Sequence, residues 1–261
     1  MSAAPSAALN DASGIQLIIS GEVARITLAR PARRNALHHA AWSAFAVVCT
    51  ELGARADIRA VVLTGEGAHF CAGADIHELQ AHTDDAAWMR QNQTTIAQAL
   101  DAYANLPQPT LALIRGSCFG GGAALAASSD FRIATIDSKI AITPAKLGLT
   151  YRLADTLRIH QLIGPARTRE MLLLAREVDA GTALIWGLVN EICEGDELES
   201  RANACVQSIV ALSGASQRGI KTILLKIRDG ITHDDDETRQ IFRHAFEGDD
   251  FRRAVNAFKK R

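Results

Sequence analysis

The stretch Pro107–Asp130, PQPTLALIRGSCFGGGAALAASSD, decides the fold of this chain. Pro107 and Pro109 end the preceding helix, because proline lacks an amide donor and clashes with the previous helical turn. The apolar, partly β-branched run 110–114 then predicts a buried parallel strand. After a glycine-rich turn, the Ala-rich segment 123–127 favours a helix. A strand, a glycine turn and a helix start bring bare backbone amides together, which suits a developing oxyanion or a phosphate.

The glycine turn at 120–122 does not match the usual phosphate-binding motifs. A Walker-type loop needs Lys followed by Ser or Thr after its last glycine, whereas Ala123 and Ala124 follow here. A dinucleotide fingerprint begins with the glycines at 65–67, but Phe70 stands in place of its last glycine. Three consecutive glycines lose much backbone entropy on folding, so close helix–strand packing alone is the weaker alternative. We therefore expect an anion-stabilising turn.

A second small-residue bend follows another apolar strand. Residues 60–63 predict that strand, and Ala72-Gly73-Ala74-Asp75 forms a bend before a helix expected at Ile76. The chain thus uses the same order of strand, small-residue turn and helix twice. Two such turns can each contribute one backbone amide to one pocket.

The length, the net charge and the cysteine pattern of the chain limit the classes of protein to which it can belong. A length of 261 residues fits one large domain or one domain with a helical appendage. A net charge of −1 argues against nucleic-acid binding driven by global charge, and no window approaches the ~18 apolar residues of a membrane span. The five cysteines form no C-x-x-C pair, so we expect reduced thiols in a cytoplasmic protein and no metal site. The N-terminus has no signal-peptide pattern.

The remaining elements follow from apolar patterning and turn signals. Further strands are expected at 15–19, 23–28, 131–135, 139–142 and 188–192. Helices are expected at 39–54, from 84 or 85 to 106 with Thr83 as N-cap, at 165–176, at 179–186 and beyond 196. Repeated strand–strand–helix units favour stacked layers over a simple doubly wound sheet. We divide the chain into a loose tail at 1–14, a core at 15–195 and a helical region at 196–261. Within that last region, the acidic run 234–237 is interpreted as a solvated helix cap.

The chain resembles the enoyl-CoA hydratase/isomerase (crotonase) superfamily over nearly its whole length. Four stretches carry the resemblance: Arg34-Asn35-Ala36-Leu37; FCAGADI at 70–76; 116–122 with Ser129-Asp130; and Leu147-Gly148-Leu149 with Thr156 and Arg158. The resemblance implies an α/β fold, the ClpP/crotonase-like spiral of ββα units, followed by a C-terminal helical trimerisation region. It also implies an acyl-CoA thioester substrate, no separate cofactor, and a homo-trimer or a hexamer built as a dimer of trimers.

The resemblance assigns roles to particular residues. The family stabilises a thioester enolate with two backbone amides, which correspond here to Ala74 and Gly121. One such preorganised donor lowers the barrier by about 2.7–4 kcal/mol. The remaining implied contacts to substrate and coenzyme A are made by Arg34 near the phosphates, by Ala72, Ala74 and Ile76 near the adenine, by Ala36 and Asp75, and by the C-terminal Phe258 and Lys259, in relatives often from a neighbouring subunit.

The sequence departs from the family where a hydratase carries two glutamates. Ala124 stands at the first of these places and Pro144-Ala145 at the second. Arg152 lies near the place of the aspartate that some isomerases use. Because hydration needs proton transfer by positioned groups, worth about 10²–10⁴-fold each, neither route is expected in its usual form.

Two hydroxyl groups remain as catalytic candidates, Thr143 and Tyr151. With Pro144, Leu147-Gly148 and the run 75–79, they resemble the methylmalonyl-CoA decarboxylase branch, although that branch keeps a glutamate where Ala124 stands. Decarboxylation itself generates the enolate, so a hydroxyl would only orient the carboxylate or deliver a proton.

The alternatives for these residues are structural. Thr143 is equally consistent with a strand-end cap and Tyr151 with a packed core phenol. His77 is expected on the surface or at the pocket's edge, and Asp155 as a helix cap. At the level of the whole protein, the alternative is a crotonase-fold protein that binds an acyl-CoA without turnover.

Overall fold

A seven-stranded sheet forms the centre of the computed structural model, which describes residues 8–10 and 13–258. The first three strands pair antiparallel and the rest are parallel. Their order is β1 (Ala8–Asn10), β2 (Ile15–Ser20), β3 (Val23–Leu28), β4 (Ala60–Gly65), β5 (Thr110–Ile114), β7 (Phe131–Thr135) and β10 (Glu191–Cys193). Because β4 and β5 are parallel neighbours, the turns that follow them leave the same edge of the sheet.

A second, three-stranded sheet lies beside that edge. It consists of β6 (Ser117–Phe119), β8 (Lys139–Ala141) and β9 (Glu177–Asp179). The sequence predicted the middle strand to within one residue, but it gave no signal for the two outer ones, which have three residues each. The small sheet matters for the site because β6 leads directly into the glycine turn.

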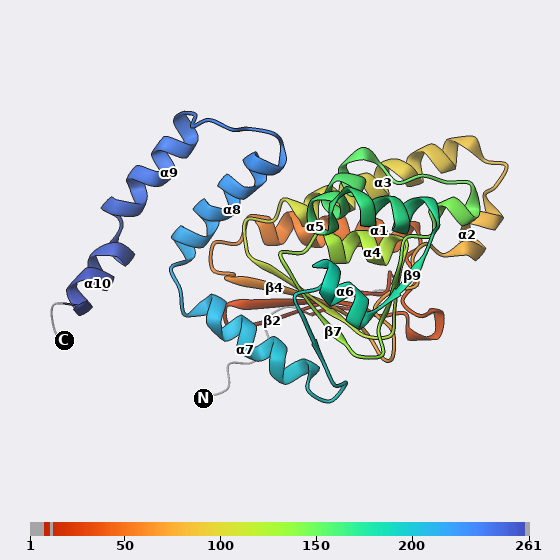
Figure 1. Ribbon diagram of the computed structural model, residues 1–261, viewed down its shortest axis with the longest axis horizontal. Coiled ribbons are helices and arrows are strands. Elements are labelled where there is room, and N and C mark those ends of the chain that lie inside the picture. The colour runs from red at the N-terminus through yellow and green to blue at the C-terminus, as the bar shows by residue number, and fades with distance from the viewer. Residues whose placement is uncertain (1–7, 11–12, 259–261) are drawn as a thin grey trace.

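Helices cover both faces of the large sheet (Figure 1). On one face lie α1 (His39–Gly53), α3 (Ala86–Ala104), α4 (Gly121–Ala127) and α5 (Leu153–Leu173), and on the other lies α7 (Leu198–Val210). Alternate residues of one strand point to the two layers: Val61 and Leu63 join the core under α1, whereas Ala60 and Val62 pack against α7. Two short helices, α2 (Ile76–Ala81) and α6 (Ala180–Trp186), complete this part.

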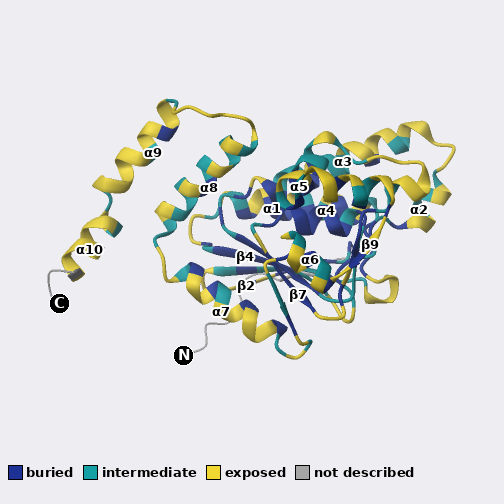
Figure 2. Cartoon of the chain, viewed as in Figure 1, coloured by how far each residue is buried: buried dark blue, intermediate teal, exposed yellow. Residues whose placement is uncertain are grey.

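The last three helices project away from the sheet. They are α8 (Gly214–Arg228), α9 (Asp236–Glu247) and α10 (Asp249–Phe258), and Figure 2 shows α9 and α10 largely exposed. One buried side chain ties α8 to the core: Lys221 Nζ donates to the carbonyl of Gln108 (2.8 Å) and to Asp130 (2.6 Å). None of the described helices combines the length and apolar character that a membrane crossing requires.

Several boundaries differ from those expected from the sequence. Asp85, not Thr83, caps α3, because its carboxylate accepts from the amides at the helix start. The helix expected at 165–176 forms the second part of α5 (Leu153–Leu173): a break at Gly164 (φ 73°) separates it from the preceding helical segment, so it begins at Pro165 as expected but ends at Leu173.

The terminal segments also differ in part. In the expected tail, Ala8–Asn10 pairs with β2. The strand expected at 188–192 forms at 191–193, because the amides of Leu188 and Val189 donate to the carbonyl of Ala183 in α6 instead. Asp235 caps α9, which confirms the cap interpretation of the acidic run.

Candidate active site

The first small-residue turn, Ala72-Gly73-Ala74, is held by the backbone around Leu37. The Leu37 amide donates to the carbonyl of Gly73 (2.8 Å), and the Asp75 amide donates to the carbonyl of Leu37 (3.0 Å). Gly73 has φ of 99°, a conformation that favours glycine. In a trans peptide the N–H points away from the carbonyl, so the Ala74 amide faces away from Leu37. No described residue accepts a hydrogen bond from that amide.

The second turn is held at Gly120. Its amide donates to the carbonyl of Ala141 (2.9 Å), and its carbonyl accepts from the Ala124 amide (3.0 Å) and from the hydroxyl of Tyr151. Gly120 has φ of 49°, again in the region that favours glycine. Gly121 is the first residue of α4, and its N–H has no acceptor among the described residues.

The two turns lie against each other. A methyl group added at Gly73 would lie 3.5 Å from the nitrogen of Gly121, and one added at Gly120 would lie 3.8 Å from the Cα of Gly73. The residues just before the two turns form an isolated β-bridge, in which the Cys71 amide donates to the carbonyl of Ser117 (3.0 Å) and the Phe119 amide donates to the carbonyl of Cys71 (2.8 Å). The two unpaired amides therefore come from neighbouring segments that are fixed together.

Close packing accounts for the other glycines of the second turn. A methyl group at Gly121 would lie 2.8 Å from Cζ2 of Trp42, and one at Gly122 would lie 2.6 Å from Cβ of Cys71. Packing was the weaker alternative from the sequence, yet it applies to both residues. The run of glycines by itself is therefore weaker support for an anion site than expected, and that interpretation rests on the unpaired amides instead.

The residues expected to contact coenzyme A lie around the first turn. Arg34 is exposed with φ of 49°, and its carbonyl accepts from the Ala72 amide (2.9 Å). Ile76 is 40% exposed at the start of α2, whereas Ala36 is buried and its carbonyl accepts from the Arg30 guanidinium (2.6 Å). Arg34 and Ala72 are thus neighbours, and Ile76 follows the first turn at the exposed start of α2.

Asp75 has a structural role that the sequence did not indicate. Its carboxylate accepts from Arg30 (2.9 Å) and from the His77 amide (3.2 Å), which caps α2. Burial raises the pKa of Asp75, but the hydrogen bond and positive charge of Arg30, together with backbone N–H donors at the start of α2, hold that pKa below its ordinary value. His77 itself is exposed, as one of the two interpretations expected.

Asn35 is a positioning residue that sequence reasoning missed. Its Oδ1 accepts from the Arg30 amide (2.9 Å), and its Nδ2 donates to the carbonyls of Glu66 (2.9 Å) and His69 (2.6 Å). With φ of 56°, it adopts a left-handed conformation that asparagine tolerates better than most residues. An asparagine next to a basic turn was therefore the signal in the sequence that could have indicated this positioning role.

Thr143 and Tyr151 both reach Gly120. Thr143 precedes the 3₁₀ helix η2 (Pro144–Leu147) without capping it, and its Oγ1 would lie 3.5 Å from a methyl group added at Gly120. This hydroxyl has no hydrogen-bond partner among the described residues, and its role at the end of the strand stays a prediction. Tyr151 is half-buried against the core, and burial raises its pKa well above the ordinary value.

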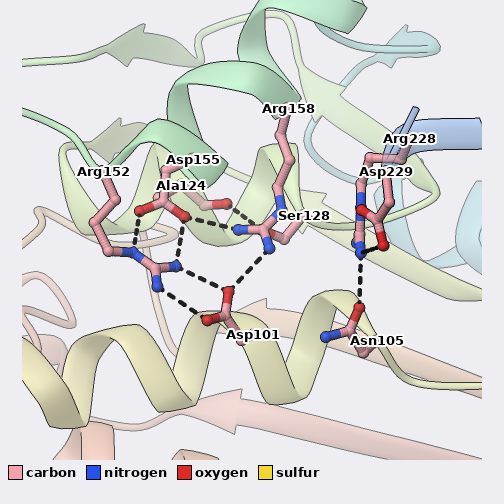
Figure 3. A network of polar contacts seen from close by, with 9 residues as sticks. All are labelled: Asp101, Asn105, Ala124, Ser128, Arg152, Asp155, Arg158, Arg228 and Asp229. Atoms are coloured by element: carbon pink, nitrogen blue, oxygen red, sulfur yellow. Dashed lines mark hydrogen bonds and ion pairs between the residues drawn. The ribbon is translucent and has the colours of Figure 1, made fainter. Parts of the chain in front are cut away.

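An ion-pair network joins α3 and α5 (Figure 3). Arg152 donates to Asp101 on α3 (3.0 Å) and to Asp155 (2.9 Å), and Arg158 donates to the same two carboxylates. The hydrogen bond from Arg152 holds the pKa of Asp101 below its ordinary value. The expectation that Asp155 caps a helix was wrong: it lies inside the first turn of α5 and is buried between the two arginines.

The remaining predicted positions are the C-terminal residues Phe258 and Lys259 and the two places where a hydratase carries glutamates. Phe258 ends α10, which Figure 1 shows at the opposite end of the molecule from α2, and Lys259 lies outside the described residues. Ala124 is buried on α4, and Ala145 is exposed on η2. In the described part of the chain, no group of three or more His, Cys, Asp or Glu side chains is placed to hold a metal ion.

Comparisons with known proteins agree with this architecture. The sequence profile of the enoyl-CoA hydratase/isomerase family matches residues 19–261. The probable enoyl-CoA hydratase EchA8 of Mycobacterium bovis is 30% identical over 238 residues, covering 89% of this chain and 90% of the relative.

Two solved structures extend the likeness to three dimensions. An enoyl-CoA hydratase/isomerase family protein from Hyphomonas neptunium has a TM-score of 0.90 and 34% identity, with 95% of both chains covered. An enoyl-CoA hydratase homologue from Thermobifida fusca, in complex with acetoacetyl-CoA, has a TM-score of 0.78 and 31% identity, with 89% of this chain and 93% of that one covered.

The fold is therefore the α/β fold of the crotonase superfamily. The chain belongs to the enoyl-CoA hydratase/isomerase family.

Proposed function

We propose that this protein is an acyl-CoA enzyme that holds the oxygen of a thioester enolate between the amides of Ala74 and Gly121. The observation that carries the proposal is the pair of unpaired N–H groups on adjoining turns. Such fixed donors need no reorganisation as charge develops on the thioester oxygen. The relative from Thermobifida fusca, which was solved with acetoacetyl-CoA, supports a CoA thioester as the ligand.

The residues around the first turn can bind the coenzyme A part of the ligand. Arg34 offers an exposed cation for the phosphates, and the exposed start of α2 at Ile76 offers an apolar surface for the adenine. Phe258 and Lys259 would then act from a neighbouring copy, since α10 and α2 lie at opposite ends of one chain.

A calorimetric and spectroscopic titration with acetoacetyl-CoA tests the proposal. We expect saturable heat and a change in the absorbance of the ligand, with tighter binding than free coenzyme A. No heat and no spectral change would overturn the proposal.

Decarboxylation of a short malonyl-type thioester is the second candidate reaction. The Thr143 hydroxyl has no partner among the described residues and approaches Gly120, so it is available to a substrate carboxylate. Ala124 and Ala145 offer no carboxylate for hydration. A mass-resolved screen of crotonyl-, 3-hydroxyacyl-, methylmalonyl- and ethylmalonyl-CoA distinguishes the reactions: loss of CO₂ supports decarboxylation, whereas hydration of crotonyl-CoA contradicts it. No turnover of any ester, together with binding, would indicate an idle acyl-CoA-binding protein.

We also propose a homo-trimer, alone or paired into a hexamer, held by the C-terminal helices. Apolar residues at helical spacing are exposed on α8 and α9, namely Ile220, Leu224, Ile227, Phe242 and Phe246. Burial of such side chains against another copy would stabilise the assembly. Light scattering after size-exclusion chromatography tests this: the wild type should have three or six times the chain mass, and Phe242→Asp with Phe246→Asp should lower it. A monomeric wild type would contradict the assembly.

A further inference from the structure

The peptide that joins Gly120 to Gly121 carries two groups with different partners. Its carbonyl accepts from the Ala124 amide (3.0 Å) and from the Tyr151 hydroxyl. Its N–H is the donor that the proposed function assigns to the thioester oxygen. In a planar trans peptide these groups point in opposite directions, so a group that fixes the carbonyl also aims the N–H.

The other donor peptide is held differently. The carbonyl of Gly73 accepts from the backbone amide of Leu37 at 2.8 Å, and the Cys71 thiol lies 4.0 Å away as a weak donor. On the Gly120 side, by contrast, a phenol hydroxyl supplies one of the two hydrogen bonds. Of the two peptides that carry the proposed donors, only Gly120–Gly121 accepts a hydrogen bond from a side-chain hydroxyl. Replacing that tyrosine by phenylalanine removes a single oxygen atom.

Tyr151 is itself held in place. Its ring packs against the hydrophobic core, and the next residue, Arg152, is bound to Asp101 on α3 and to Asp155. Burial raises the pKa of Tyr151 well above its ordinary value, so the hydroxyl stays protonated and remains a donor at neutral pH. The phenol cannot easily turn from the Gly120 carbonyl toward a ligand.

We propose that Tyr151 is a positioning residue that aims and polarises the Gly121 N–H through the carbonyl of Gly120. Hydrogen bonds in a chain strengthen one another, so donation to the carbonyl makes the N–H of the same peptide a better donor. This inference rests on the proposed function. In it, Tyr151 positions the Gly121 N–H and does not contact the substrate.

The infrared stretch of a bound thioester carbonyl tests this role. The probe is acetoacetyl-CoA carrying carbon-13 at the thioester carbonyl, bound to wild type, to Tyr151→Phe and to Tyr103→Phe. The chain has two tyrosines, and Tyr103 is a matched control because its hydroxyl is hydrogen-bonded to Ser129 (2.8 Å), away from the turn. We expect the wild type and Tyr103→Phe to lower the carbonyl frequency equally, and Tyr151→Phe to lower it less.

Affinity provides a second readout. In Tyr151→Phe, binding of acetoacetyl-CoA should weaken about three- to tenfold, the equivalent of one neutral hydrogen bond, while free coenzyme A binds as before. Equal weakening for both ligands, or an unchanged carbonyl frequency, would overturn the positioning role. If the wild type itself shifts no carbonyl frequency, the proposed function fails instead.

A substitution that keeps the shape of the ring covers the case in which Tyr151→Phe does not fold. In the Tyr103→Phe background, 3-fluorotyrosine replaces Tyr151 alone, because no other tyrosine is left. Fluorination makes the phenol a stronger donor, so the carbonyl frequency should fall further than in Tyr103→Phe. No change, or a rise, would contradict the proposal.

Discussion

The two small-residue turns each leave one backbone amide without an acceptor among the described residues, but they are held by different contacts. Gly73–Ala74 is held by the backbone of Leu37, and the neighbouring Asp75 is held by Arg30. Gly120–Gly121 is held by the start of α4 and by the hydroxyl of Tyr151, which lies 31 residues after Gly120 in the chain. The difference is therefore one of chemistry and not of distance along the chain: backbone hydrogen bonds with Leu37 hold the first turn, whereas the second depends in part on the side chain of Tyr151.

The largest effect is expected from filling the space at the second turn. In Gly121→Val the new side chain meets Trp42, whose Cζ2 would lie 2.8 Å from the first added carbon, so the amide is displaced. Turnover of the best substrate from the CoA-ester screen should fall about 10²–10³-fold, the usual effect of losing one oxyanion donor.

Gly195→Ala is the matched control for this loss. A methyl group at Gly195 meets no atom within 4 Å, so that variant should keep full turnover. Retention of turnover in Gly121→Val would show that the second turn supplies no donor.

A smaller effect is expected from weakening the support of the first turn. Asp75→Asn keeps an oxygen that can cap α2 but loses the ion pair with Arg30, which is largely buried. Unfolding in urea should show a loss of about 1–2 kcal/mol, as for a hydrogen bond to a charged group. Asp57→Asn, at an exposed pair with Arg55, should leave the free energy of unfolding unchanged. Equal effects in both variants would indicate that the Arg30–Asp75 pair adds no stability.

The smallest effect is expected on the free energy of unfolding, from the ion-pair network between α3 and α5, and it depends on pH. The pKa of Asp101 lies below its ordinary value of 3.8, because Arg152 donates to it. The ionised form is therefore favoured by folding, and its contribution is present above about pH 4 and is lost as pH falls further.

Chemical unfolding of wild type and Asp101→Asn between pH 2 and 7 measures this contribution. The wild type should be more stable at neutral pH, and the difference should shrink to zero at the acid end. A difference that grows toward low pH would contradict the ion-pair assignment.

Local sequence patterns predicted many of the strands and helices. The proline-bounded strand at 110–114 and the strands at 23–28 and 131–135 form where expected, because apolar runs between turn residues are buried whatever surrounds them. The three-residue strands β6 and β9 gave no such signal, since their pairing partners are distant in sequence.

The sequence by itself determined the family, the two small-residue turns and their order after parallel strands. Only the tertiary structure decided that Gly121 packs against Trp42, that Tyr151 binds the carbonyl of Gly120, and that Asp155 is buried between two arginines. The physical reason is distance along the chain. A strand or a helix start depends on neighbouring residues, whereas a hydrogen bond between side chain and backbone depends on where two remote segments meet in space.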